Sequence, residues 1–136
     1  MDDFAVFKGK LIKYNGSHNS YITIPNNVVE ISADAFSDRA VKGSLIHIDI
    51  PGNVKRINNG TVHRSVREND DYYGCFADSG VWSVKFENGI EEIGDYAFYN
   101  CRDLKSVNLP NSLLRIGSLA FYNSAITKIR IPANVR

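Results

Sequence analysis

Apolar and polar positions follow one another along this chain in a fixed order that returns several times. The clearest copy runs from Leu104 to Phe121 and reads Leu-x-x-Val-x-Leu-Pro-x-x-Leu-x-x-Ile-x-x-x-Ala-Phe. Val107 and Leu109 are two residues apart, which predicts that both face inward from one β-strand. Pro110 has no N–H to give to a sheet, so we expect it to end that strand and to start a turn.

The interval between copies is regular. The step from an apolar residue to the turn falls at Ile24-Pro25, Ile50-Pro51, Phe86-Glu87, Leu109-Pro110 and Ile131-Pro132, with spacings of 26, 36, 23 and 22 residues. A basic period of 22 or 23 residues predicts a solenoid, in which each coil buries its apolar side chains against its neighbours. The longer spacings indicate two insertions, one of about fourteen residues within 58–74 and a shorter one around 39–44.

The second half of each coil has its own pattern. Two apolar residues three apart are followed by Ser32, Asn58, Gly94 or Gly117, and we expect a tight corner there, with positive φ at the glycines and the asparagine. A small residue and a phenylalanine come next, which predicts a stacked column at Ala35-Phe36, Cys75-Phe76, Ala97-Phe98 and Ala120-Phe121. We expect this return segment to form a short helix or a 3₁₀ turn.

The two ends differ from the repeat. Residues 4–14 predict a β-hairpin with a turn at Gly9, and we interpret residues 1–18 as a cap over the open end of the stack. Residues 19–136 then form about four coils and a partial fifth, all in one domain of 136 residues. No cap is evident before Arg136, so we expect either a longer array or a frayed end.

Composition narrows the function only by exclusion. The chain is 43% hydrophobic and carries a net charge of +1 with mixed signs, which favours neither nucleic acid nor a membrane surface. It has no apolar run long enough to span a bilayer and opens with no signal peptide. Two cysteines make neither a disulfide scaffold nor a metal site; we expect Cys75 to be a buried thiol and Cys101 to be unbridged.

The repeat resembles the BspA-like leucine-rich repeats, through Leu104-x-x-Val107-x-Leu109-Pro110, Leu113, Ile116-Gly117, Ala120-Phe121 and the variant Ala97-Phe98-x-x-Cys101. The opening from Gly9 to Gly16 also looks like the leader of such arrays. The resemblance implies an α/β repeat fold: a right-handed leucine-rich-repeat solenoid with a parallel sheet on the concave face and short helices, 3₁₀ turns or short strands on the convex face. It also implies a bacterial or protozoan cell-surface or secreted protein that binds other proteins, and it offers no catalytic residues.

The strand positions that do not face the core would form the concave face. By the template they are Ser20, Tyr21 and Thr23; Ile46, His47 and Asp49; Trp82, Ser83 and Lys85; Lys105, Ser106 and Asn108; and Thr127, Lys128 and Arg130. Four of these residues are apolar or aromatic and are therefore candidate anchors for a partner: Tyr21, Ile46, His47 and Trp82. Lys85, Lys105, Lys128 and Arg130 make a basic stripe along the same face.

Each candidate has an alternative interpretation. Trp82 is either bare for a partner or covered by the long insertion, with Tyr72 and Tyr73 folded over it. The basic stripe is either a groove for acidic groups or a solvated face diluted by Asp49, and the insertion is either a binding loop or a tolerated excursion.

Catalytic and metal chemistry find little support. His18, His47 and His63 have no nucleophile at a characteristic spacing, and we expect each to be a solvated surface group. The adjacent pair Asp70-Asp71 is a weak signal for a cation, and no cofactor motif is present.

We therefore expect a non-enzymatic module for protein recognition or adhesion, presenting the concave face and the 58–74 insertion to a protein partner. Two alternatives remain open: a structural spacer in a longer protein, and a glycan-binding surface centred on Trp82. Self-association is compatible with all three.

Overall fold

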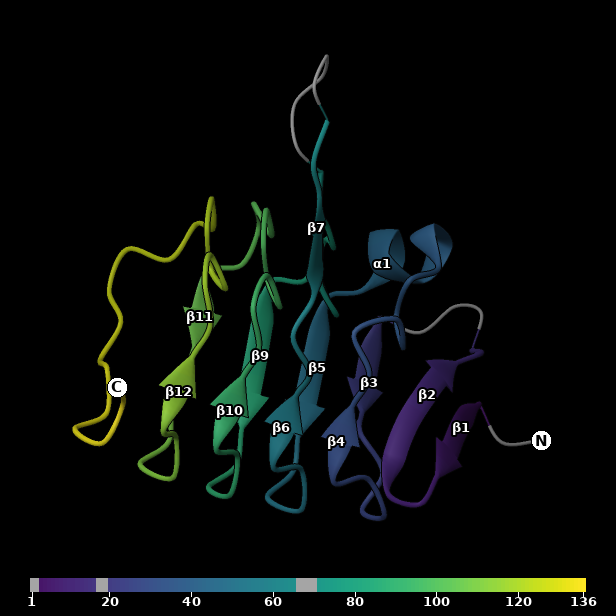
Figure 1. The fold of residues 1–136 in the computed structure, drawn as a ribbon, viewed down its shortest axis with the longest axis horizontal. Helices are drawn as coiled ribbons and strands as arrows, with labels where there is room; N and C mark the ends of the chain where they lie inside the picture. The colour runs from purple at the N-terminus through teal and green to yellow at the C-terminus, as the bar shows by residue number, and fades with distance from the viewer. Residues whose placement is uncertain (1–2, 17–19, 66–70) are drawn as a thin grey trace.

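The computed structural model describes residues 3–16, 20–65 and 71–136, and in these ranges short strands joined by turns and irregular segments form most of the regular secondary structure (Figure 1). A four-stranded parallel sheet contains β3 (Tyr21–Thr23), β5 (His47–Ile50), β9 (Ser83–Phe86) and β11 (Ser106–Val107). A six-stranded sheet contains β1 (Phe4–Phe7), β2 (Lys10–Tyr14), β4 (Glu30–Ile31), β6 (Arg56–Ile57), β10 (Glu92–Ile93) and β12 (Arg115–Ile116). Each of the four complete coils contributes one strand to each sheet.

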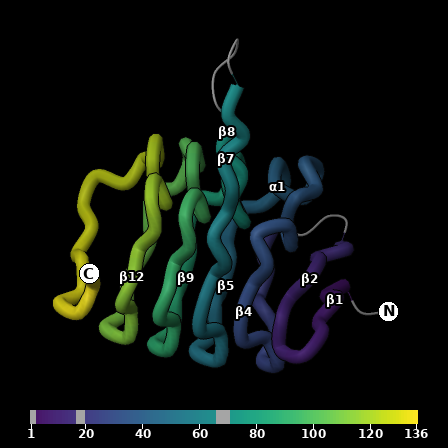
Figure 2. The backbone as a smooth tube through the Cα atoms, in the orientation of Figure 1, coloured from purple at the N-terminus to yellow at the C-terminus, as the bar shows by residue number. Residues whose placement is uncertain are grey.

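Neighbouring coils are in register. Ile22 pairs with Ile48, and Ile48 with Val84, so that one inward row crosses the four-stranded sheet. Ile31, Ile57 and Ile93 form the matching row of the six-stranded sheet. Figure 2 shows the result as a series of coils of similar outline, each placed beside the next. The apolar positions of the repeat therefore place equivalent side chains on top of one another.

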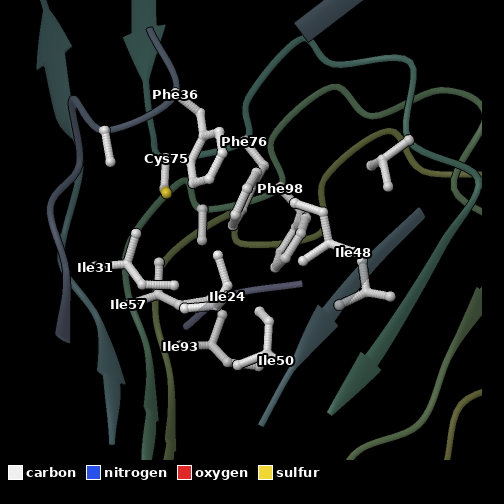
Figure 3. Close-up of a cluster of buried hydrophobic side chains, with 14 of the residues drawn as sticks. Ile24, Ile31, Phe36, Ile48, Ile50, Ile57, Cys75, Phe76, Ile93 and Phe98 are labelled. Carbon is white, nitrogen blue, oxygen red and sulfur yellow. The ribbon is translucent and has the colours of Figure 1, made fainter. Parts of the chain in front are cut away.

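The core lies between the two sheets and is closed by the predicted phenylalanines (Figure 3). The rings of Phe36 and Phe76 lie 4.8 Å apart, those of Phe76 and Phe98 5.1 Å, and those of Phe98 and Phe121 5.3 Å. Ala35, Cys75 and Ala97, which precede these phenylalanines in the sequence, are fully buried. The predicted phenylalanine column is confirmed.

The predicted N-terminal hairpin is also present. Strands β1 and β2 pair antiparallel through a turn in which Lys8 and Gly9 both have positive φ. Strand β2 pairs with β4, and the Tyr14 ring lies 5.4 Å from Phe36 and 5.0 Å from Phe4. The hairpin thus extends both the six-stranded sheet and the aromatic column. Residues 17–19 lie outside the described residues, so the boundary at residue 18 stays a prediction.

The return segment differs from the prediction of a helix or 3₁₀ turn. It consists of separate turns, such as those in which the N–H groups of Ala97 and Tyr99 donate to the carbonyls of Gly94 and Tyr96. Tyr96 and Asn100 adopt left-handed φ values of 60° and 59°. A left-handed residue reverses the local rotation of the backbone, so a right-handed helix cannot propagate through this segment.

The corner glycines are present for another reason than the one predicted. Gly94 and Gly117 do not have positive φ. A Cβ on Gly94 would instead lie 2.5 Å from the carbonyl oxygen of Ile57, and one on Gly117 would lie 2.4 Å from the nitrogen of Asp95. The close approach of one coil to the next therefore excludes a side chain at these positions.

Both insertions are folded. The shorter one forms helix α1 (Arg39–Ser44), whose N-terminus is capped by the Asp38 carboxylate accepting from the N–H of Ala40 at 2.8 Å. The longer one forms an antiparallel hairpin of β7 (Thr61–His63) and β8 (Asp71–Tyr73) in place of the expected loop, and its residues 66–70 lie outside the described residues. The hairpin projects beyond the stack on the edge where α1 also lies (Figure 1).

The fifth strand that the template predicts is not formed. Residues 125–131 contain no assigned strand, although the N–H of Ala125 donates to the carbonyl of Leu104 at 3.0 Å. In the described ranges we also find no helix with the length and apolar character needed to cross a membrane.

Candidate functional site

The outward side chains of the four-stranded sheet, together with Trp82 and Lys105 at its end, form one surface, which we call the outer face. One row of this face runs across four strands, through Tyr21, His47, Ser83 and Ser106. A second row runs through Thr23, Asp49 and Lys85. The alternation of each strand turns Ile22, Ile48 and Val84 inward and leaves the two rows outside. The sheet therefore brings together most of the residues that the sequence selected.

His47 is the centre of a polar network on this face. Its Nε2 lies 2.8 Å from Asp49 Oδ1, two residues along the same strand, and its Nδ1 lies 2.5 Å from Ser83 Oγ on the next coil. With the proton on Nε2, the imidazole donates to Asp49 and accepts from the Ser83 hydroxyl. Only 23% of the His47 side chain is exposed, so the prediction of a solvated surface histidine is wrong. The network holds its three members in a single arrangement.

This serine, histidine and aspartate are not arranged as a hydrolase site. The hydroxyl approaches Nδ1 and the carboxylate Nε2, whereas the usual triad uses the two ring nitrogens the other way round. Acyl transfer also needs N–H donors aimed at an oxyanion. The N–H groups of Trp82 and Ser83 both donate to the carbonyl of Ile46, at 2.7 and 3.2 Å. The geometry favours a structural role for the network.

Two aromatic side chains flank the network and remain open to solvent. Tyr21 is 72% exposed, and its ring centroid lies 6.2 Å from that of His47. Trp82 is 56% exposed, and the ammonium of Lys105 lies 5.6 Å from its ring centroid. A cation at this distance is attracted by the negative face of the indole. The outer face thus combines two exposed rings with a fixed polar centre.

Tyr72 and Tyr73 do not cover Trp82, which corrects one of the two interpretations of the insertion. The Tyr72 ring lies 5.0 Å from Tyr96 and 4.8 Å from Tyr99, both in the return segment of the third coil. Tyr73 is 55% exposed and lines a separate cavity beside α1. The β7–β8 hairpin therefore packs against the return segments.

Other predicted members of the face have structural roles. Ile46 is half-buried, so the prediction that it is exposed is wrong. The amide of Asn108 accepts from the N–H of Phe86 at 3.1 Å and donates to the carbonyl of Phe86 at 2.8 Å. This side chain continues the hydrogen bonding of the sheet beyond Val107.

The basic stripe is shorter than predicted. Lys85 and Lys105 lie on the outer face and are exposed. Thr127, Lys128 and Arg130 are exposed on the segment that forms no strand, so they do not continue the rows of the sheet. Asp49 lies opposite Lys85 in the register of the two strands. Its negative charge reduces the excess of positive charge on the face.

The remaining candidates stay apart from this surface. His63 is exposed on β7 and Asp71 on β8, whereas His18 and Asp70 lie outside the described residues. Both cysteines are buried and free, and burial raises the pKa of each thiol, to about 11 for Cys101. In the described ranges, no three His, Cys, Asp or Glu side chains lie close enough to hold a metal ion.

Sequence reasoning missed that Ser83 joins His47. The two residues are 36 positions apart, and the hairpin insertion lies between them. The signal was nevertheless present, because both occupy the same position of the template relative to the turn after Ile50 or Phe86.

Comparisons with known proteins identify the family of the repeat. A scan of protein families matches residues 13–66 and 72–136, in six copies, to the family described as BspA type leucine rich repeat region. Comparison with curated proteins gives no match.

Solved structures give the same picture of the fold. The pneumococcal vaccine antigen PcpA is similar with a TM-score of 0.62 and 22% identity, over 93% of this chain and 32% of PcpA. The T. pallidum leucine rich repeat protein TpLRR is similar with a TM-score of 0.52 and 23% identity, over 93% of this chain and 65% of TpLRR. These likenesses support a leucine-rich-repeat fold, and the chain spans less than two thirds of the length of either protein.

Proposed function

Because this chain belongs to the family of BspA type leucine-rich repeats, we propose that it is a protein-recognition module that binds its partner through the outer face. The observation that carries the proposal is the exposed Trp82 ring, which lies beneath Lys105 immediately before the start of β9. Large aromatic side chains that stay exposed beside polar groups are typical anchors of protein interfaces. Tyr21 supplies a second ring on the same sheet.

Preorganisation supports this assignment. His47 is tied to Asp49 within its own strand and to Ser83 on the neighbouring coil, so the centre of the face is ordered before a partner arrives. The strands beneath pair through backbone hydrogen bonds in a fixed register. A surface that is already ordered loses little conformational entropy on binding, and more of the contact energy is retained as affinity.

The setting that we propose is a bacterial or protozoan cell surface, where such a module would serve adhesion or recognition. Family membership supports this setting, and the right-handed solenoid with the outer face on its concave side is part of the same proposal. We propose binding as the function in place of catalysis, since the His47 network lacks the arrangement of a hydrolase.

Glycan recognition at Trp82 is the second candidate, because an exposed indole also offers a flat apolar face to a sugar ring. A structural spacer is the third, and it predicts that neither ring contributes to any binding event. Substitutions at Tyr21 and Trp82 separate the two binding functions from the spacer.

The test places a photo-crosslinking benzoylphenylalanine at position 21 or at position 122, so that Trp82 stays in place. Tyr21 and Tyr122 are both exposed tyrosines, but Tyr122 stacks on Tyr99 in the return segment, so it provides a matched control away from the outer face. With extracts of surface proteins, we expect adducts from position 21 that unlabelled wild-type protein displaces and unlabelled Trp82→Ala does not.

Equal adducts from both positions would contradict recognition through the outer face. A glycan array probed with the wild type and with Trp82→Ala distinguishes the second candidate. Sugar binding that is lost in Trp82→Ala, without any protein adduct, would replace protein recognition by glycan recognition.

A further inference from the structure

The two insertions into the repeat meet at one cavity. Helix α1 contributes Arg39 and Lys42, the β7–β8 hairpin contributes Tyr73, and the turns of two coils contribute Asp34 and Asp78 to a cavity of about 540 Å³. Pockets of roughly 300–1,000 Å³ are typical for small ligands. The fourth coil carries no such insertion and still stacks in register, so the repeat itself does not require either element.

Helix α1 is fixed firmly enough to shape a site. Val41 and Leu45 are buried in the core, and the Lys42 carbonyl accepts from the N–H of Gly80 at 2.9 Å at the end of the second coil. On the other wall, Tyr72 packs against Tyr96 and Tyr99 and thereby holds β8, which carries Tyr73. Both walls of the cavity are therefore anchored to the stack.

The charged groups of this cavity are largely unpaired. In the part of the chain that the structure describes, the side chains of Arg39, Lys42 and Asp34 form neither a hydrogen bond nor an ion pair. Asp78 is different, because its Oδ1 accepts from the Asn100 amide at 2.7 Å. Two cations and two carboxylates thus line the same space, and in the described residues none of them forms an ion pair with an opposite charge.

Lys42 would be stabilised by an anionic ligand in this cavity. Burial lowers the pKa of its ammonium, and the nearby Cys75, Asp78, Cys101 and Asp34 only partly oppose that effect. A carboxylate in the cavity would stabilise the charged form and restore the lost interaction with water. The exposed Tyr73 ring provides an apolar face beside it, against which a ring could stack.

We propose that this cavity binds an acidic monosaccharide, with the sugar carboxylate on Arg39 and Lys42, hydroxyl groups donating to Asp34, and the ring face on Tyr73. This site is distinct from the outer face. The two insertions would give the chain a ligand-binding site that the repeat alone does not form. The mixed charge of the wall fits a hydroxylated acid better than a simple anion, because Asp34 needs a donor and would repel a second negative charge.

The test is a titration of the ¹⁵N-labelled chain with glucuronate, followed by the amide shifts of Lys42, Gly43 and Gly74. We expect saturable shifts at these amides with glucuronate. Glucose has the same ring without the carboxylate, and acetate has the carboxylate without the ring, so we expect each to bind at least tenfold more weakly. Equal binding of glucose and glucuronate would overturn the proposal, as would equal binding of acetate.

Variants locate the site. We expect Arg39→Met and Lys42→Met each to weaken glucuronate binding at least tenfold, while Lys105→Met, which removes an exposed cation of the outer face, leaves it unchanged. The amide spectrum of each variant reports whether its fold is intact. Shifts confined to the outer face, or unchanged affinity in a folded Lys42→Met variant, would show that the cavity does not hold the acid.

Discussion

The ammonium of Lys105 lies 5.6 Å from the centroid of the Trp82 ring, although the two residues belong to adjacent coils. The coils align them because the N–H of Lys105 donates to the carbonyl of Trp82 at 3.0 Å. The lysine covers part of an indole that still remains 56% exposed. An anchor of this kind is open to a partner and yet has a preferred orientation.

Trp82 should report this exposure directly, since it is the sole tryptophan. We expect a red-shifted fluorescence maximum and ready quenching by acrylamide. Lys105→Ala should increase the quenching further and lower stability by about 0.5–1 kcal/mol, the contribution of an exposed cation–π pair. Lys85→Ala removes a lysine from the same face, away from the indole, and should change neither. A blue-shifted, protected tryptophan would mean that another group covers the ring.

The His47 network should behave as a coupled pair in unfolding experiments. His47→Ala, Ser83→Ala and the double variant form a cycle, for which we expect a coupling energy of about 0.5–1.5 kcal/mol by urea denaturation. Strict additivity of the two single variants would show that the hydrogen bond contributes nothing.

The same network should be chemically inert as a hydrolase. We expect no adduct at Ser83 with a fluorophosphonate probe, because the neighbouring N–H groups already donate to Ile46 and leave no oxyanion hole. Mass spectrometry of the treated protein checks this expectation. Labelling of Ser83 that disappears in His47→Ala would contradict the structural role.

The corner glycines provide a test of packing between coils. Gly94→Ala should destabilise the chain by at least about 1–3 kcal/mol, because its Cβ would lie 2.5 Å from backbone atoms of residues 57 and 58. Gly43→Ala is the matched control, since a Cβ there meets nothing within 4 Å and the position is helical. That variant should gain about 0.5–1 kcal/mol. If Gly94→Ala and Gly43→Ala changed the free energy of unfolding equally in urea denaturation, close packing between coils would not explain the glycine at position 94.

The two cysteine thiols should be unreactive toward thiol reagents in the native protein. We expect no reaction of Cys75 or Cys101 with an aromatic disulfide reagent at pH 8, and reaction of both after unfolding, because burial raises both thiol pKa values. Rapid native labelling would contradict the burial of either thiol.

The same shift predicts alkaline destabilisation. An unfolded Cys101 loses its proton near its ordinary pKa of 9.0, whereas the folded thiol keeps it to about pH 11. Between these values the unfolded state binds fewer protons, so the free energy of unfolding falls as the pH rises. The lowered pKa of Lys42 acts in the opposite direction. Cys101→Ala should therefore show a smaller decline between pH 9 and 11 than the wild type.

The sequence predicted what depends on repetition. The phenylalanine column, the strand at Val107 and the hairpin at Gly9 each follow from a local pattern that the neighbouring coils reinforce. The outward row of Tyr21, His47 and Ser83 follows from the same alignment.

The errors arose where a second coil determines the outcome. The reason for glycine at position 94 is the backbone of residues 57 and 58, and the hydrogen bonds of the Asn108 amide to Phe86 join two coils. Tyr72 turns to Tyr96 and Tyr99 because the insertion folds as a hairpin, which its polar sequence did not indicate. Such contacts join positions that no single copy of the repeat contains.

Because β3, β5 and β9 pair in register, equivalent side chains on the outer face are separated by a constant distance from one coil to the next. Successive strands in a sheet are about 4.8 Å apart, so each row advances by that one step for each coil. Duplicating or deleting a whole coil would lengthen or shorten the face by one step and leave every other spacing unchanged. Partner size could therefore be matched by changing the number of coils, with no alteration to the fold of any coil.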